Sequence, residues 1–89
     1  MSAFNYQSGT DKHNQASAVN RDYQTYYTVT FDKPMPDTDY SIILNPLRVE
    51  TVVSVNVKTV TGFIYYIRVV SDSLSGDIGA RWDAFRIPH

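Results

Sequence analysis

Cysteine is absent from this 89-residue sequence, and the absence removes several kinds of chemistry at once. Disulfides, cysteine-ligated zinc and thiol catalysis are all excluded. A chain of this length supports one domain with a small core, and we assign that domain to residues 1–89.

A surplus of charge of either sign is also missing. Eight Lys and Arg residues stand against nine Asp and Glu residues, so the net charge is -1. Nucleic acids and anionic membranes both select a concentrated cationic surface, so we expect no nucleic-acid partner. No apolar run approaches the roughly 20 residues of a transmembrane helix, so we expect no membrane insertion. The N-terminal stretch lacks the basic and apolar regions of a signal peptide, and none is expected.

No segment has the apolar spacing of an amphipathic helix, whereas β-branched and aromatic runs are frequent. The sequence predicts strands at residues 2–7, 26–31, 40–44, 53–58, 63–70 and 80–87. Strands that are joined only by turns and loops indicate an all-β fold, a six-stranded antiparallel β-sandwich.

Alternation predicts which side chains face the core. In the run 63–70 these are Phe63, Tyr65, Ile67 and Val69, and in the run 53–58 the valines share one face, with Val55 inward. The opposite face of 63–70 is also apolar, which indicates a second buried interface and therefore an oligomer.

Two polar segments are predicted to be loops. Residues 8–22 form a surface loop long enough to suggest a function, and residues 71–79 form a second. The segment 72–77 superficially resembles a calcium loop. The twelfth position counted from Asp72 is Asp83, inside a predicted strand, and no helix flanks the segment. We therefore expect an ordinary polar hairpin loop, no metal and no cofactor.

Catalytic patterns are missing as well. His13 lies in a predicted loop and His89 at the terminus, where neither is expected to be oriented as a base. No Ser-His-Asp order, paired buried carboxylates or glycine-rich phosphate loop is present. We expect a protein that is not an enzyme.

The order of several short motifs resembles the H-type lectin domain, which is also found at the tips of bacteriophage tail fibres. The motifs are Gln7-Ser8-Gly9, Thr30-Phe31 followed by prolines, Thr61-Gly62-Phe63, and Trp82 in the last strand. The resemblance covers nearly the whole chain. It implies a compact trimer of six-stranded β-sandwiches that binds carbohydrate near protomer interfaces without a metal.

The sequence departs from that family at its sugar contacts. The animal lectins have a disulfide, an Arg entering the fourth strand and a His after the fifth. Here there is no Cys, Arg48 comes a few residues early, and Ser71-Asp72 follow the fifth strand. Asp11 is the nearest match to the family's acidic contact. The N-acetylgalactosamine specificity of the animal members therefore does not carry over.

The predicted ligand-binding residues are polar or aromatic positions in the expected loops. Tyr23 beside Arg21 and Asp22 offers a ring for stacking and charges for hydroxyl groups, although chance loop composition explains it almost as well. Trp82 either stacks on sugar or fills the core or an interface, and we prefer the second reading. The full predicted set is Asp11, Arg21, Asp22, Tyr23, Arg48 and Asp72.

These observations lead to one functional hypothesis and two alternatives. The hypothesis is a non-catalytic carbohydrate-binding, receptor-binding head in the virion tail, a homotrimeric tail-fibre tip that recognises host cell-surface glycan or cell-wall polysaccharide. The alternatives are a structural trimerisation or capping module of a fibre that binds no sugar, and a secreted bacterial lectin.

Overall fold

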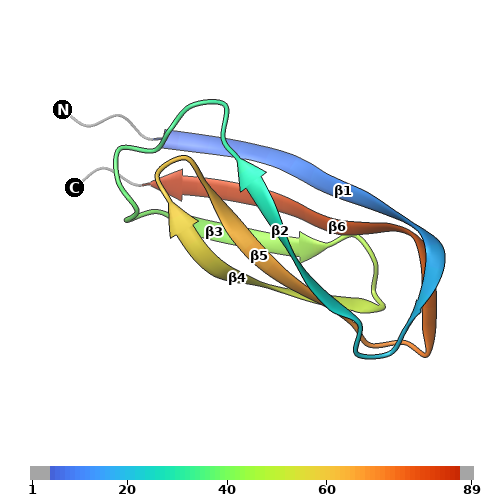
Figure 1. Ribbon diagram of the computed structural model, residues 1–89. Coiled ribbons are helices and arrows are strands. Elements are labelled where there is room, and N and C mark those ends of the chain that lie inside the picture. The colour runs from blue at the N-terminus through green and yellow to red at the C-terminus, as the bar shows by residue number, and fades with distance from the viewer. Residues whose placement is uncertain (1–4, 87–89) are drawn as a thin grey trace.

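The computed structural model describes residues 5–86, and all of its regular structure is β-strand (Figure 1). The predicted all-β class with six strands is confirmed. The strands are β1 (Asn5–Asn20), β2 (Gln24–Thr30), β3 (Ser41–Pro46), β4 (Thr51–Thr59), β5 (Gly62–Val69) and β6 (Ser73–Arg86). Within this range no helix is long and apolar enough to cross a membrane.

The strands form two sheets of three, with the orders β1-β6-β3 and β2-β5-β4, and every pairing is antiparallel. Aromatic rings join the sheets: Phe63 of β5 lies 5.6 Å from Trp82 of β6, centroid to centroid. The arrangement is compatible with a β-sandwich. The molecule is elongated, with principal extents of 50 × 18 × 17 Å.

The core follows the predicted alternation of β5. Phe63, Tyr65, Ile67 and Val69 are all buried, as expected. They pack against apolar side chains of β6 and against Phe31, which directly follows β2. Tyr40, just before β3, is buried and donates its hydroxyl to the Gly62 carbonyl at 2.8 Å, so its polar tip has a partner.

The prediction of a long loop at residues 8–22 is wrong, because β1 runs through most of this segment. Its backbone pairs with β6 almost continuously, with one irregularity between Gln15 and Val19. An edge strand of this kind is held by main-chain hydrogen bonds while most of its side chains face water. Its polar composition therefore concealed a strand. Only residues 21–23 connect β1 to β2.

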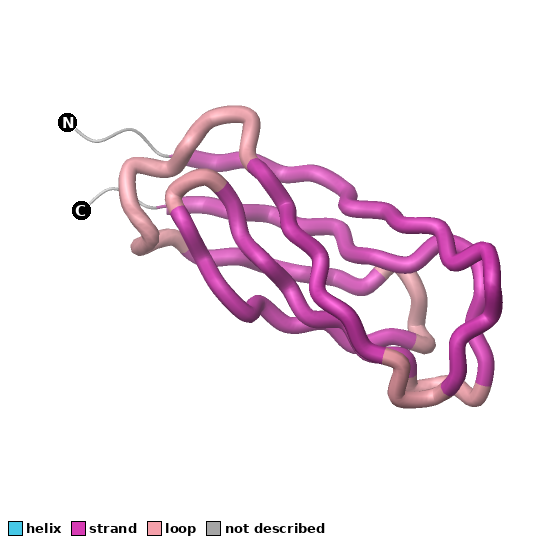
Figure 2. Tube along the Cα trace, viewed as in Figure 1, coloured by secondary structure: helices cyan, strands magenta, loops and turns pink. Residues whose placement is uncertain are grey.

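The predicted loop at residues 71–79 is likewise mostly strand. It forms the first half of β6, which pairs with the second half of β1. Gly76 and Gly79 have φ values of 97° and 141°, and such backbone is available chiefly to glycine. Both strands bend in this region (Figure 2).

The prediction that the valines of β4 share one face is wrong, because a bulge interrupts the strand between Val55 and Val57. Val55 pairs with the buried Tyr65, whereas Val57 pairs with Ile64 on the outer face. Val55 does lie on the inner side, but it keeps 38% exposure because β4 is the edge of its sheet.

The other strand boundaries shift by a few residues. The run predicted at 26–31 is β2, Gln24–Thr30, and that at 40–44 is β3, Ser41–Pro46. Pro46 is accommodated because β3 is an edge strand. Of the predicted first strand, residues 2–4 lie outside the described residues, as does position 87 of the last.

The three connections β1–β2, β3–β4 and β5–β6 gather at one end of the molecule, hereafter the distal end (Figures 1 and 2). The β2–β3 and β4–β5 connections lie at the opposite end, with the first and last described residues. The predicted site residues therefore fall into distinct regions of the fold.

Candidate functional site

Asp11 lies on the inner side of β1, between the two sheets. Its Oδ2 accepts a hydrogen bond from the Tyr65 hydroxyl at 2.7 Å and lies 2.8 Å from His13 Nε2. The His13 ring stacks on Tyr27, with centroids 3.7 Å apart. Burial, together with the hydrogen bond to Asp11, raises the pKa of the Tyr65 phenol. The Asp11 carboxylate is therefore engaged by neighbouring side chains of this chain.

Arg21, Asp22, Tyr23 and Asp72 come together at the distal end. Arg21 Nε forms an ion pair with Asp72 Oδ1 at 3.1 Å, and Asp22 Oδ1 pairs with Arg68 Nη1 at 3.0 Å. The Asp22 backbone has a φ of 71°, a turn conformation that Asp adopts more readily than most residues. Tyr23 is 36% exposed beside these pairs. The charged side chains at the distal end are therefore engaged in ion pairs with each other.

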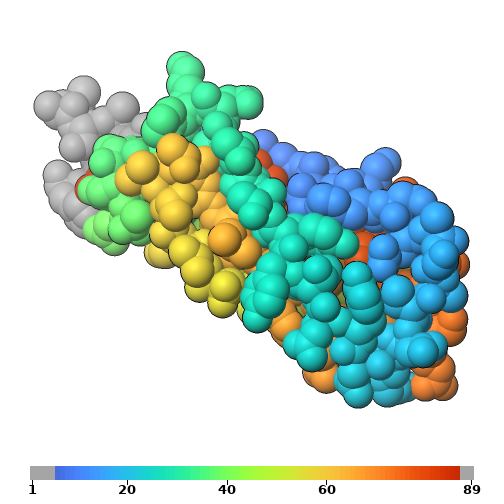
Figure 3. Space-filling model, in the orientation of Figure 1, coloured from blue at the N-terminus to red at the C-terminus, as the bar shows by residue number. Residues whose placement is uncertain are grey.

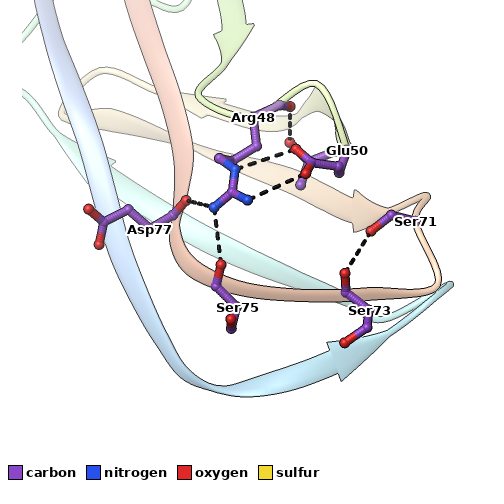
Figure 4. Close-up of polar contacts among 7 residues, drawn as sticks. Arg48, Glu50, Ser71, Ser73, Ser75 and Asp77 are labelled. Carbon is purple, nitrogen blue, oxygen red and sulfur yellow. Dashed lines mark hydrogen bonds and ion pairs between the residues drawn. The ribbon is translucent and has the colours of Figure 1, made fainter.

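Arg48 ties the β3–β4 connection to β6 (Figure 4). Its Nη1 donates to the Ser75 carbonyl at 3.1 Å, and its Nε and Nη2 each lie 3.4 Å from a Glu50 carboxylate oxygen. The chain passes close to this guanidinium at Gly76, where a Cβ would lie 3.2 Å from Nη1. The donors of Arg48 are thus directed to acceptors within this chain.

Two grooves that the sequence did not indicate lie along the first half of β1. The first, the edge groove, has a volume of about 490 Å³; the second, the face groove, has about 480 Å³. Tyr6, Ser8 and Trp82 line both. The edge groove also includes Gln7, Thr30, Asp32, Lys33 and Pro34, and the face groove includes Gly9, Thr10, Asn45, Arg81 and Asp83.

Tyr6 is the exposed aromatic residue shared by the grooves. Its partner in the ladder is Phe85, on the outer face of the β1-β6-β3 sheet, and its side chain is 53% exposed. Its hydroxyl donates to Asp83 Oδ1, and this hydrogen bond raises the pKa of Tyr6. The ring is thereby held near a carboxylate while much of its surface stays open to solvent.

Trp82 is a core residue that also lines the grooves. It is 8% exposed and packs against Phe31 and Phe63, which confirms the prediction that it fills the core. The indole N–H has no hydrogen-bond partner among residues 5–86. Every fully buried side-chain N or O atom in that part of the chain has a partner, so the indole nitrogen is not fully buried.

Glycine at position 9 leaves space beside that nitrogen. Gly9 pairs with Trp82 across the ladder, and a Cβ there would lie 3.1 Å from the indole Nε1. Gln7, two residues earlier, donates from Nε2 to the Lys33 carbonyl at 2.6 Å and so attaches the β2–β3 connection to β1. The Gln7-Ser8-Gly9 motif noted in the sequence therefore builds the walls of the grooves.

The grooves could hold a hydroxylated ligand. They combine one exposed ring, an indole N–H, the Ser8 hydroxyl, and carboxylates at Asp32 and Asp83. Among the described residues, no three His, Cys, Asp or Glu side chains are grouped so that they could hold a metal ion.

Sequence patterns could not locate these grooves because their members come from four separate segments of the chain. The only available signals were the Gln-Ser-Gly motif and the tryptophan.

Comparison of the chain with models of protein families found no match, and comparisons with curated proteins and with solved structures found no significant match.

Proposed function

We propose that this chain is a non-catalytic carbohydrate-binding domain, an H-type-lectin-like head that recognises cell-surface glycan or cell-wall polysaccharide from the tip of a phage tail fibre. The observation that carries the proposal is that the same two grooves are lined by the exposed Tyr6 and by the mostly buried Trp82, whose indole N–H has no partner among residues 5–86. The virion setting rests on the motif resemblance.

The chemistry of the grooves suits a sugar. A pyranose presents an apolar face of C–H groups, which packs on an aromatic ring, and hydroxyl groups around its rim. Carboxylates accept two such hydroxyls, and an indole N–H donates to a hydroxyl oxygen. Tyr6 supplies the ring, Asp32 and Asp83 the acceptors, and Trp82 the donor. A shallow polar site of this type gives weak binding, which calls for several copies.

A homotrimer would supply those copies. The outer side of the β2-β5-β4 sheet, seen in Figure 3, exposes apolar side chains on both edge strands: Val52 and Val57 of β4 are each 43% exposed, and Tyr26 of β2 is 58% exposed. Val49, in the β3–β4 connection, is 95% exposed. Exposed apolar surface beside an edge strand is a site of association. We assign a second copy of this chain to it, and the resemblance implies three copies.

The test is retention on host cell-wall polysaccharide in affinity electrophoresis. Tyr6→Ala should reduce the association constant at least tenfold, because it removes the stacking surface and releases Asp83. Tyr23→Ala, which truncates an exposed tyrosine at the distal end, is the matched control and should bind as the unaltered protein does. The reverse result would place the sugar site at the distal end, among Arg21, Asp22 and Asp72.

A structural module that trimerises a fibre without binding sugar is the second candidate, and the exposed valines of β4 favour it. This candidate predicts the same oligomer but no retention on any polysaccharide. A trimer that fails to bind polysaccharide from a panel of hosts would favour it over the lectin.

A further inference from the structure

The face groove contains a row of polar side chains that crosses all three strands of its sheet. Arg81 on the central strand β6 pairs with Thr10 of β1 on one side and with Asn45 of β3 on the other. Directly opposed residues in antiparallel sheets have Cβ atoms about 4.5–5.5 Å apart and point to the same face. The guanidinium is thus flanked by a hydroxyl and an amide, all three lining one groove.

Arg81 differs from the other arginines in its partners. The others each pair with a carboxylate: Arg21 with Asp72, Arg48 with Glu50, Arg68 with Asp22 and Arg86 with Asp37. Arg81 is exposed and forms no ion pair with any described residue. An arginine in a groove without an anionic partner presents a planar set of donors that matches a carboxylate or phosphate.

The nearest carboxylate along the same face is that of Asp83, two residues further on β6. It accepts the hydrogen bond from the Tyr6 hydroxyl and forms no ion pair with Arg81 in the described structure. The face groove therefore has two chemically different parts. Near Tyr6, a carboxylate accepts hydrogen bonds from hydroxyls; at the Thr10–Arg81–Asn45 row, a cation and two neutral polar groups face the ligand.

We propose that the ligand is an acidic glycan, and that the Thr10–Arg81–Asn45 row binds its oxyanion while the sugar ring lies against Tyr6. This inference rests on the proposed carbohydrate-binding function and narrows its substrate class. The oxyanion is a carboxylate, as in a uronic acid, or a phosphate, as in a phosphodiester-linked polymer. Because the whole chain has a net charge of -1, general attraction to polyanions does not account for such binding.

The experiment measures retention in gels that contain polygalacturonate, carboxyl-reduced polygalacturonate, or a glycerol-phosphate polymer. The unaltered protein should be retained by at least one of the two anionic polymers and much less by the reduced one. Arg81→Gln should weaken that retention about ten- to a hundredfold, the range for loss of a charged hydrogen-bond partner. Arg81→Lys should restore part of it.

Lys12→Gln is the matched control, since it removes one positive charge from an exposed position of β1 that does not line the groove. It should leave retention unchanged, and an equal loss in both variants would overturn the assignment to Arg81. The two anionic polymers distinguish carboxylate from phosphate recognition. If the unaltered protein bound the reduced polymer as strongly as polygalacturonate, and Arg81→Gln weakened neither, the acidic ligand would be refuted and the proposed function would stay intact. Failure to bind any of the three polymers would overturn the acidic ligand, and failure to bind host cell-wall polysaccharide as well would overturn both proposals.

Discussion

At the scale of single residues, the glycines explain motifs whose meaning the sequence left open. Gly62, from the Thr61-Gly62-Phe63 motif, lies where β5 meets the end of β2. A Cβ on Gly62 would fall 1.9 Å from the Val29 carbonyl oxygen, which is much closer than any van der Waals contact. The motif therefore reflects close strand packing at this position.

We expect Gly62→Ala to lower the free energy of unfolding by about 1–3 kcal/mol, the typical cost of forcing backbone apart in a packed region. Chemical denaturation measures the change. Thr61→Ala, which truncates the exposed neighbour in the same turn, should change stability by less than about 0.5 kcal/mol. Equal stabilities for Gly62→Ala and the unaltered protein would show that β5 and β2 do not approach this closely.

At the scale of elements, strands with an apolar stripe were predictable, whereas the mainly polar pairing of β1 with the first half of β6 was not. The alternation of Phe63, Tyr65, Ile67 and Val69 identifies β5 because burial selects those side chains. The polar residues of β1 and the first half of β6 carry no such stripe, since they are held by main-chain pairing to each other. The groove residues were missed for a related reason: the row through Arg81 exists only once the register of three strands is known.

The position of β4 at the edge of its sheet changes what a charge at position 55 should do to the fold. The inward orientation that the sequence predicts for Val55 would make Val55→Asp a buried, unpaired charge. With 38% exposure at a sheet edge, an aspartate there can reach water, so we expect this variant to fold cooperatively at reduced stability. Val69→Asp, at 0% exposure, should cost several kcal/mol and abolish folding. Thermal melts followed by circular dichroism compare the two. Failure of Val55→Asp to fold would show that a side chain at position 55 cannot reach water at this edge of the sheet.

At the scale of the whole molecule, the two proposed surfaces belong to different sheets. The face groove opens on the outer side of the β1-β6-β3 sheet, whereas the exposed valines lie on β4 of the other sheet. A trimer assembled through the valines would direct its face grooves outward, so that several could contact one polysaccharide. Linked weak sites gain effective affinity of roughly a hundredfold or more when they bind the same target. Assembly and sugar binding should then be separable by mutation.

We therefore expect the double variant Val52→Lys, Val57→Lys to dissociate the trimer while leaving each groove intact, because paired lysines on the β4 surface repel and resist desolvation. Light scattering should give about three times the 10.1 kDa chain mass for the unaltered protein and the chain mass itself for the variant. Retention on immobilised polysaccharide should fall by about two orders of magnitude, while the affinity for a short soluble oligosaccharide stays the same. Ala16→Lys with Ala18→Lys adds the same charge on exposed positions of β1 and should alter neither quantity. A variant that remains trimeric would place the interface on another face. An unaltered protein that is monomeric at micromolar concentration would show that avidity does not contribute to polysaccharide binding.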